Sequence, residues 1–215
     1  MTRSLVWQLA AVAVLMFASR LDAQEAPPKL PIVVVDVHGN VSNFPGNQAL
    51  ADSRALNQAE LPGLGFGGDL GLHFYPFKWR QMTLGVGGQL TLTRARRTPE
   101  NGTITGLRPV MERFASITPQ VSFNFGTGDG WSYLSAGIST SQWSVVPDGL
   151  DQLPPDLEGL KTINYGGGAR WFAEPHLAFS FDVRFYAINP STPTSGLPNG
   201  PRTTLLIVGA GISLK

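Results

Sequence analysis

The sequence predicts an all-β fold, an eight-stranded antiparallel up-and-down transmembrane β-barrel preceded by a cleaved signal peptide. Three observations favour this fold class. Apolar and polar residues alternate along most of the chain, the alternating segments are long, and short connections between them alternate with long ones. An alternation with a period of two places apolar side chains on one face of a strand and polar side chains on the other.

The N-terminus has the features of a secretory signal peptide. Arg3 precedes an apolar run, Leu5 to Phe17, and a small residue, Ala23, follows at a suitable cleavage point. This run is shorter than the roughly 20 residues that a membrane-spanning helix needs. We therefore predict a signal peptide over residues 1–23 and a barrel domain over 24–215, with a short N-terminal anchor helix as the alternative. No later segment has about 18 uninterrupted apolar residues, so any later membrane span must consist of strands.

The period of two is clearest at residues 177–188. Phe179 and Phe181 share one face there, and Asp182 and Arg184 share the other. Most of the alternating segments suit tilted membrane strands of about 9–11 residues better than ordinary strands of about 5–6. The eight predicted strands are 32–41, 63–75, 81–95, 113–125, 131–144, 161–173, 177–188 and 203–214.

The connections alternate in length without exception. Those after the second, fourth and sixth strands are short, at 76–80, 126–130 and 174–176, and the others are long and rich in Pro, Asn and Gly. Outer-membrane barrels have this arrangement, with tight periplasmic turns and long outer loops. An even number of strands returns both termini to the periplasmic side.

Two local features complete the predicted strand plan. Pro119 lacks the N–H that a closed ladder requires, so we predict a β-bulge at this residue. Aromatic residues near the strand ends predict girdles at the two membrane interfaces. The predicted girdle residues are Phe74, Phe77, Trp79, Phe123, Phe125, Trp131, Trp171 and Phe172 at the turn side and Trp143 and Phe185 at the other.

The polar faces of the strands predict what fills the barrel. An eight-stranded barrel is just wide enough for side chains to fill, so the apolar faces must contact lipid and the polar faces must point inward. Because an unpaired buried charge costs several kcal/mol, the inward arginines are expected to pair with aspartates. The predicted interior network contains Asp36, Asp69, Arg170, Asp182 and Arg184. A structural plug is the main interpretation, and a narrow conduction path is the alternative.

The remaining chemistry of the sequence is sparse. There is no cysteine, and the three histidines are dispersed, with His38 and His73 predicted inward and His176 in a turn, so we predict no metal, cofactor or catalytic residue. Sixteen basic residues nearly balance fifteen acidic ones, which argues against nucleic acid as a partner. The second long connection is rich in arginine, which predicts a contact with lipopolysaccharide phosphates. These arginines are Arg94, Arg96, Arg97 and Arg108.

One stretch resembles a known family. Residues 165–172 read YGGGARWF, and residues 177–184, after a short turn, alternate with an inward Asp182 and Arg184. This hairpin resembles the penultimate hairpin of OmpA-like outer-membrane β-barrel domains. The resemblance implies a small eight-stranded outer-membrane barrel and says little about activity. The final residues, Leu214 and Lys215, depart from the aromatic end that is common in such barrels.

Taken together, these patterns predict a non-enzymatic integral protein of the bacterial outer membrane with a structural or surface-interaction role. The expected partners are outer-membrane lipids, including lipopolysaccharide, and the barrel-assembly machinery during insertion, and the chain is expected to be a monomer. The alternatives are a narrow channel for small solutes or ions, a soluble lipocalin-like barrel that binds an apolar ligand, and a lipid-modifying enzyme.

Overall fold

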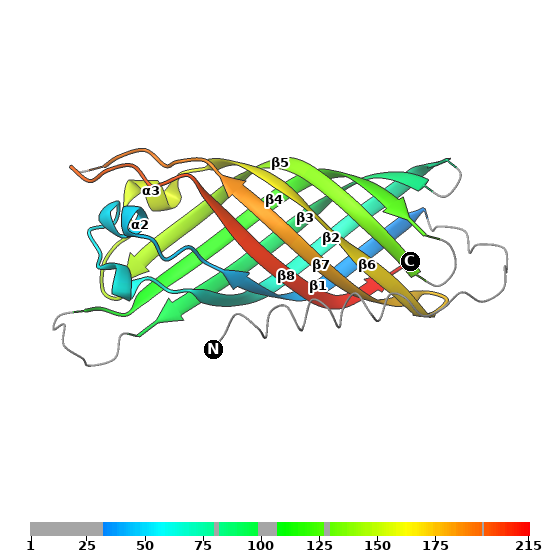
Figure 1. Cartoon of the computed structure of the whole chain (residues 1–215), viewed down its shortest axis with the longest axis horizontal. Helices are drawn as coiled ribbons and strands as arrows, with labels where there is room; N and C mark the ends of the chain where they lie inside the picture. The colour runs from blue at the N-terminus through cyan, green and yellow to red at the C-terminus, as the bar shows by residue number, and fades with distance from the viewer. Residues whose placement is uncertain (1–31, 80–81, 99–106, 127–129, 195) are drawn as a thin grey trace, which may run out of the picture.

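The structure is a closed antiparallel barrel of eight strands, as the sequence predicts (Figure 1). It is a computed structural model, and it describes residues 32–79, 82–98, 107–126, 130–194 and 196–215. Each strand pairs with the next along the chain, and β8 closes the barrel on β1. The strands are β1 (Val33–Asn43), β2 (Leu64–Trp79), β3 (Met82–Arg97), β4 (Val110–Phe125), β5 (Gly130–Pro147), β6 (Leu160–Glu174), β7 (Leu177–Ile188) and β8 (Thr203–Leu214). The predicted signal peptide, residues 1–23, lies outside the described residues.

Three short helices lie at one end of the barrel. The connection between β1 and β2 contains α2 (Gln48–Asp52) and η1 (Gln58–Glu60), and the connection between β5 and β6 contains α3 (Pro154–Leu157). Figure 1 shows them beside the long connections, opposite the end where β8 finishes. In the described part of the chain, no helix is both long and apolar enough to cross a membrane.

The two prolines that bear on the strand plan behave differently from expectation. The predicted turn at 76–80 is largely strand, because β2 continues to Trp79 and a shift in register between Phe74 and Phe77 accommodates Pro76. The bulge predicted at Pro119 is wrong. The register between β4 and β5 is the same before and after this residue, and only the β5 partners of Thr118 and Pro119 are missing from the ladder. The missing N–H of proline is thus absorbed by a local opening of the ladder rather than by an inserted residue.

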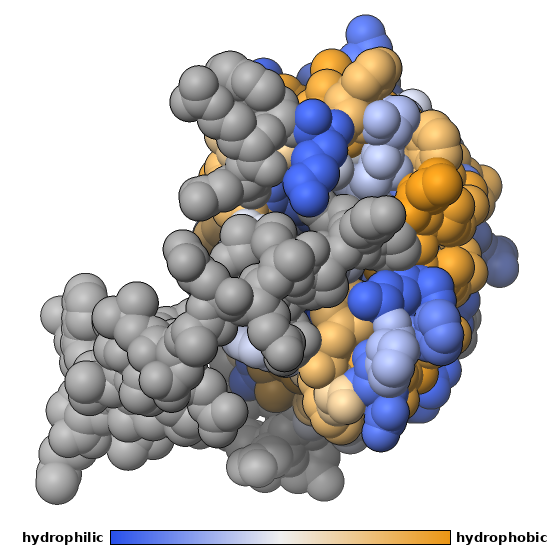
Figure 2. Space-filling model, turned by 90° about the vertical axis from the view of Figure 1, so that its right-hand side faces the viewer, coloured by the Kyte–Doolittle hydropathy of each residue, from blue (hydrophilic) through white to orange (hydrophobic). Residues whose placement is uncertain are grey.

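The apolar faces of the strands point outward. On β7, Phe179 and Phe181 are 60% and 42% exposed, whereas Asp182 and Arg184 are 4% and 3% exposed. A soluble barrel that binds an apolar ligand has the opposite arrangement, so the lipocalin-like alternative is wrong. Figure 2 views the end with the short connections and shows apolar residues gathered along the outer wall, beside hydrophilic patches. This exposed apolar wall is the surface that a membrane-spanning barrel presents to lipid.

Two tryptophans do not belong to the predicted girdles. Trp131 and Trp143 are 3% and 4% exposed and point into the barrel. Both lie on the same face of β5 as the inward Tyr133, so the alternation along this strand dictates their position. The exposed aromatic residues of the predicted turn-side girdle are Phe74, Phe77, Phe123, Phe125 and Trp171.

Candidate functional site

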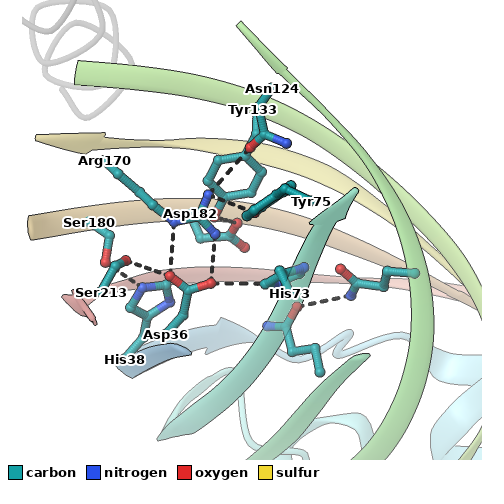
Figure 3. A network of polar contacts seen from close by, with 12 residues as sticks. Asp36, His38, His73, Tyr75, Asn124, Tyr133, Arg170, Ser180, Asp182 and Ser213 are labelled. Carbon is teal, nitrogen blue, oxygen red and sulfur yellow. Dashed lines mark hydrogen bonds and ion pairs between the residues drawn. The ribbon is translucent and has the colours of Figure 1, made fainter. Parts of the chain in front are cut away.

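The centre of the barrel is occupied by a network of polar side chains (Figure 3). Its most buried member is Arg170 of β6, which is fully buried and reaches across the barrel to Asp36 of β1. The guanidinium donates to both carboxylate oxygens, from Nε at 2.9 Å and from Nη2 at 2.6 Å. Its remaining Nη1 donates to Tyr75 at 3.3 Å, and its plane lies 4.2 Å from the ring centroid of Tyr133. This bidentate pair joins β6 to β1, which β7 and β8 separate in the barrel wall.

A second ion pair lies beside the first one. Arg184 Nε lies 2.7 Å from Asp182 Oδ1, and both residues come from β7. The guanidinium also donates from Nη1 to Asn164 Oδ1 at 3.0 Å, and the hydroxyl of Tyr133 donates to Asp182. Tyr133 therefore contacts both ion pairs, through its ring and through its hydroxyl (Figure 3).

The third predicted aspartate has no arginine partner in the structure. Asp69 accepts hydrogen bonds from Asn40 at 2.9 Å and from Thr91 at 2.6 Å. Sequence reasoning assigned this carboxylate to the ion-pair network, but parity along a strand gives only the direction of a side chain. Parity does not predict which side chain of another strand will lie opposite, because that depends on the shear of the barrel.

The structure also brings together a serine and a histidine. His38 Nε2 lies 2.7 Å from Ser180 Oγ, and both side chains are buried inside the barrel. Such a pair has the composition of an activated nucleophile. A substrate would have to pass through the packed interior to reach it, so the contact is structural in this geometry.

The interior leaves very little space. A hollow of about 10 Å³ lies among His38, Asp69, His73, Asp182 and Arg184. This is about the volume that one water molecule needs, roughly 10–15 Å³. No group of three or more acidic or histidine side chains within the described ranges could hold a metal ion.

The outer end of the interior is apolar, which the sequence analysis did not predict. Buried side chains of the strands meet Leu50, Ala51 and Leu61 from the connection between β1 and β2, and together they form one hydrophobic cluster. Its strand members include Phe114 and Tyr186, whose rings meet edge to face at 5.0 Å. We call the segment 44–63 the plug segment, because its apolar residues fill the mouth of the barrel.

Ion pairs and hydrogen bonds fasten the long connections to one another. Arg54 of the plug segment donates from Nε to Asp156 of α3 at 2.9 Å, and both side chains are nearly fully buried. Glu60 accepts a hydrogen bond from the backbone N–H of Arg108 at 2.7 Å. In the connection between β7 and β8, the backbone N–H of Thr192 donates at 2.8 Å to Glu158, which follows α3. The four outer connections thus form one linked cover rather than four independent loops.

The four arginines expected to contact lipopolysaccharide have different positions. Arg94, Arg96 and Arg97 belong to β3, and only Arg108 lies in the connection that follows. Arg96 forms an exposed ion pair with Asp148, and Arg97 donates to the carbonyl oxygen of Leu61 in the plug segment. Arg94 points outward, on the face that carries the apolar side chains of β3.

A shallow groove of about 690 Å³ lies on the outer wall over β5 and β6. The glycines at 166–168 line it, as do Tyr165 and Phe185, whose rings stack with their centroids 5.4 Å apart. Its lining is mostly apolar and faces outward at the level of the lipid-contacting residues. Acyl chains of the surrounding membrane have the chemistry to fill such a groove.

Comparisons with known proteins identify similar folds but assign the chain to no family. No family model and no curated protein matches the sequence. Among solved structures, Neisserial surface protein A aligns with a TM-score of 0.56 and 13% identity, over 86% of this chain and 97% of its own. The attachment invasion locus protein Ail of Yersinia pestis aligns with a TM-score of 0.40 and 14% identity, over 85% of this chain and 96% of its own. The outer membrane protease OmpT of Escherichia coli aligns with a TM-score of 0.38 and 9% identity, over 91% of this chain and 99% of its own. The first likeness supports the fold of an outer-membrane β-barrel, and the OmpA-like family name stays a prediction.

Proposed function

We propose that this chain is an integral protein of the bacterial outer membrane with a closed interior, and that it acts through its outer surface in a structural or surface-interaction role. One observation supports the proposal: an ion-pair network lies at the centre of the barrel, and the plug segment with its apolar cluster lies at the outer mouth. In this proposal the two layers together interrupt the continuous water-filled path that a channel requires.

The proposed role is non-enzymatic, and the position of the serine and histidine that lie in contact supports it. Catalysis by a serine and a histidine requires access for substrate, and the contact between His38 and Ser180 is enclosed by the packed interior. A lipid-modifying enzyme would carry such a pair on the membrane side of the wall. Of the histidines in the described ranges, His38 and His73 face the interior, and His176 lies in the short turn between β6 and β7.

Export and insertion complete the proposal. Residues 1–23 act as the signal peptide, so the mature chain begins at Gln24, and the barrel-assembly machinery inserts it as a monomer. The mass of the protein extracted from outer membranes tests the cleavage point, since an uncleaved chain would retain the mass of residues 1–23.

The decisive experiment measures ion conductance in planar lipid bilayers. The purified full chain is expected to give no stable single-channel currents. A variant in which a short Gly/Ser linker replaces residues 46–62 removes most of the plug segment and serves as the comparison. Reproducible unitary currents from the unaltered protein would overturn the closed interior and favour the narrow-channel alternative.

A further inference from the structure

Two arginines face each other on the outer wall of the barrel. Arg94 of β3 and Arg113 of β4 are directly opposite in the antiparallel ladder, and both are exposed. Opposite residues in such a ladder have their Cβ atoms about 4.5–5.5 Å apart, and like charges in this position are destabilising. An anion bound between two such arginines would offset their repulsion.

Among the residues that the structure describes, neither arginine has an anionic partner. The nearest comparable residue on the same face, Arg96, already forms an ion pair with Asp148. Glu112, which precedes Arg113 in the chain, is fully buried and points into the barrel, and Arg113 faces Ser144 on β5. The two guanidinium groups therefore offer a fork of hydrogen-bond donors that is open to a ligand.

The height of the pair on the wall indicates what kind of anion can reach it. Below Arg94, toward the short turns, the same face of β3 carries Leu92, Val86 and Leu84, all exposed. About ten residues separate Leu84 from Arg94, which corresponds to roughly 34 Å along the strand and roughly 26 Å along the membrane normal at a tilt of about 40°. An apolar band in such barrels is about 25 Å tall. Arg94 and Arg113 thus lie at the upper edge of the band, at the level of lipid headgroups.

We propose that Arg94 and Arg113 together form a binding site for a phosphate group of lipopolysaccharide in the outer leaflet. The inference rests on the proposed outer-membrane location, which places the long connections on the outer side. Guanidinium groups match phosphate oxygens in charge and in bidentate geometry. The exposed apolar residues below the pair, Leu92 and Ile117, would lie against the acyl chains of the same lipid.

The site differs from the arginine cluster that the sequence suggests. Arg96 and Arg97 are engaged by Asp148 and by the plug segment, and Arg113 was not among the expected residues. The register between β3 and β4 reveals the pair, because residues 19 positions apart in the sequence become direct neighbours only in this pairing.

The test is a lipid titration of the detergent-solubilised full chain. Binding of diphosphoryl lipid A, of lipid A without its phosphates and of phosphatidylglycerol is measured by native mass spectrometry. The chain is expected to prefer diphosphoryl lipid A over both other lipids. The variant R94Q/R113Q should bind it at least roughly tenfold more weakly, as the loss of two charge-assisted contacts implies. The matched control R202Q removes one exposed positive charge from another connection at the same end and should bind as the unaltered chain does.

A second measurement is the unfolding temperature, whose change in R113Q should reverse its sign when diphosphoryl lipid A is added. Because like charges repel, R113Q should unfold at the same or a higher temperature than the unaltered chain in detergent free of acidic lipid, and at a lower temperature once diphosphoryl lipid A is added. Equal binding by R94Q/R113Q, or equal affinity for phosphate-free lipid A or phosphatidylglycerol, would overturn the proposal. Such a result would not change the outcome expected from the conductance experiment. Failure of this binding site can therefore be distinguished from failure of the proposed closed interior.

Discussion

Arg170 is the residue on which the centre of the barrel depends. Its guanidinium is fully buried, and it contacts Asp36, Tyr75 and Tyr133 from three other strands. A buried charge is tolerated only where its partner and its hydrogen bonds are all in place. The same residue thus links strands that are far apart in the sequence.

Arg170→Leu is expected to destabilise the barrel strongly, because Asp36 would remain buried without its charge partner. Breaking a buried pair in this way costs about 3–5 kcal/mol. The double variant Asp36→Asn/Arg170→Leu removes both charges and should recover a large part of the loss. Urea unfolding of the protein in detergent micelles measures both effects. A double variant as unstable as the single one would show that Asp36 and Arg170 are not coupled as an ion pair.

Two glycines on the strands provide a matched pair for a packing test. A Cβ atom at Gly168 would lie 2.1 Å from the carbonyl oxygen of Phe181 and 2.7 Å from the hydroxyl of Tyr133, whereas a Cβ atom at Gly39 would have no atom within 4 Å. Gly168→Ala should therefore lower the unfolding midpoint or prevent assembly, and Gly39→Ala should leave it nearly unchanged. Heat-modifiable mobility on a gel reports the closed barrel in each case, and equal behaviour of the two variants would contradict the tight packing around Tyr133.

At the scale of elements, a buried ion pair joins the plug segment to α3. Asp156 accepts from Arg54 and also from the backbone N–H groups of Val145 and Leu153, so its carboxylate joins α3, β5 and the plug segment. Apolar contacts of Leu50 and Leu61 within the hydrophobic cluster complete the attachment.

Arg54→Ala is expected to loosen the plug segment without opening the barrel wall, because the strand ladders do not involve this side chain. Limited proteolysis with proteinase K should cut the variant within residues 44–63 much faster than the unaltered chain. Arg202→Gln, which removes an exposed charge from another connection, provides the control. Equal protection of both variants would mean that the remaining hydrogen bonds and apolar contacts hold the segment without this ion pair.

At the scale of the whole molecule, the alternation along the strands was sufficient to predict the eight strands, their order and the direction of their faces. The period of two fixes the face of each residue, and the alternation of connection lengths fixes the up-and-down topology. Phe179, Phe181, Asp182 and Arg184 illustrate this, since each points where the pattern places it.

What the sequence could not predict depends on tertiary packing. The plug segment has no repeating pattern, and the contact between Arg54 and Asp156 joins residues about 100 positions apart. Trp131 and Trp143 could have been assigned inward from their parity, but their aromatic character suggested an interface. Pro119 shows that a ladder can open locally without a bulge.

The central claim is that the apolar side of every strand faces lipid while the ion pairs are enclosed. The chain contains no cysteine, so single cysteines at Phe179, Ser180 and Phe181 can be spin-labelled in the protein reconstituted in lipid vesicles without background. Labels at Phe179 and Phe181 are expected to collide freely with molecular oxygen, which partitions into the bilayer, and labels at Ser180 should be inaccessible to oxygen and to water-soluble nickel complexes. High oxygen accessibility at Ser180, with protected labels at Phe179 and Phe181, would contradict the account.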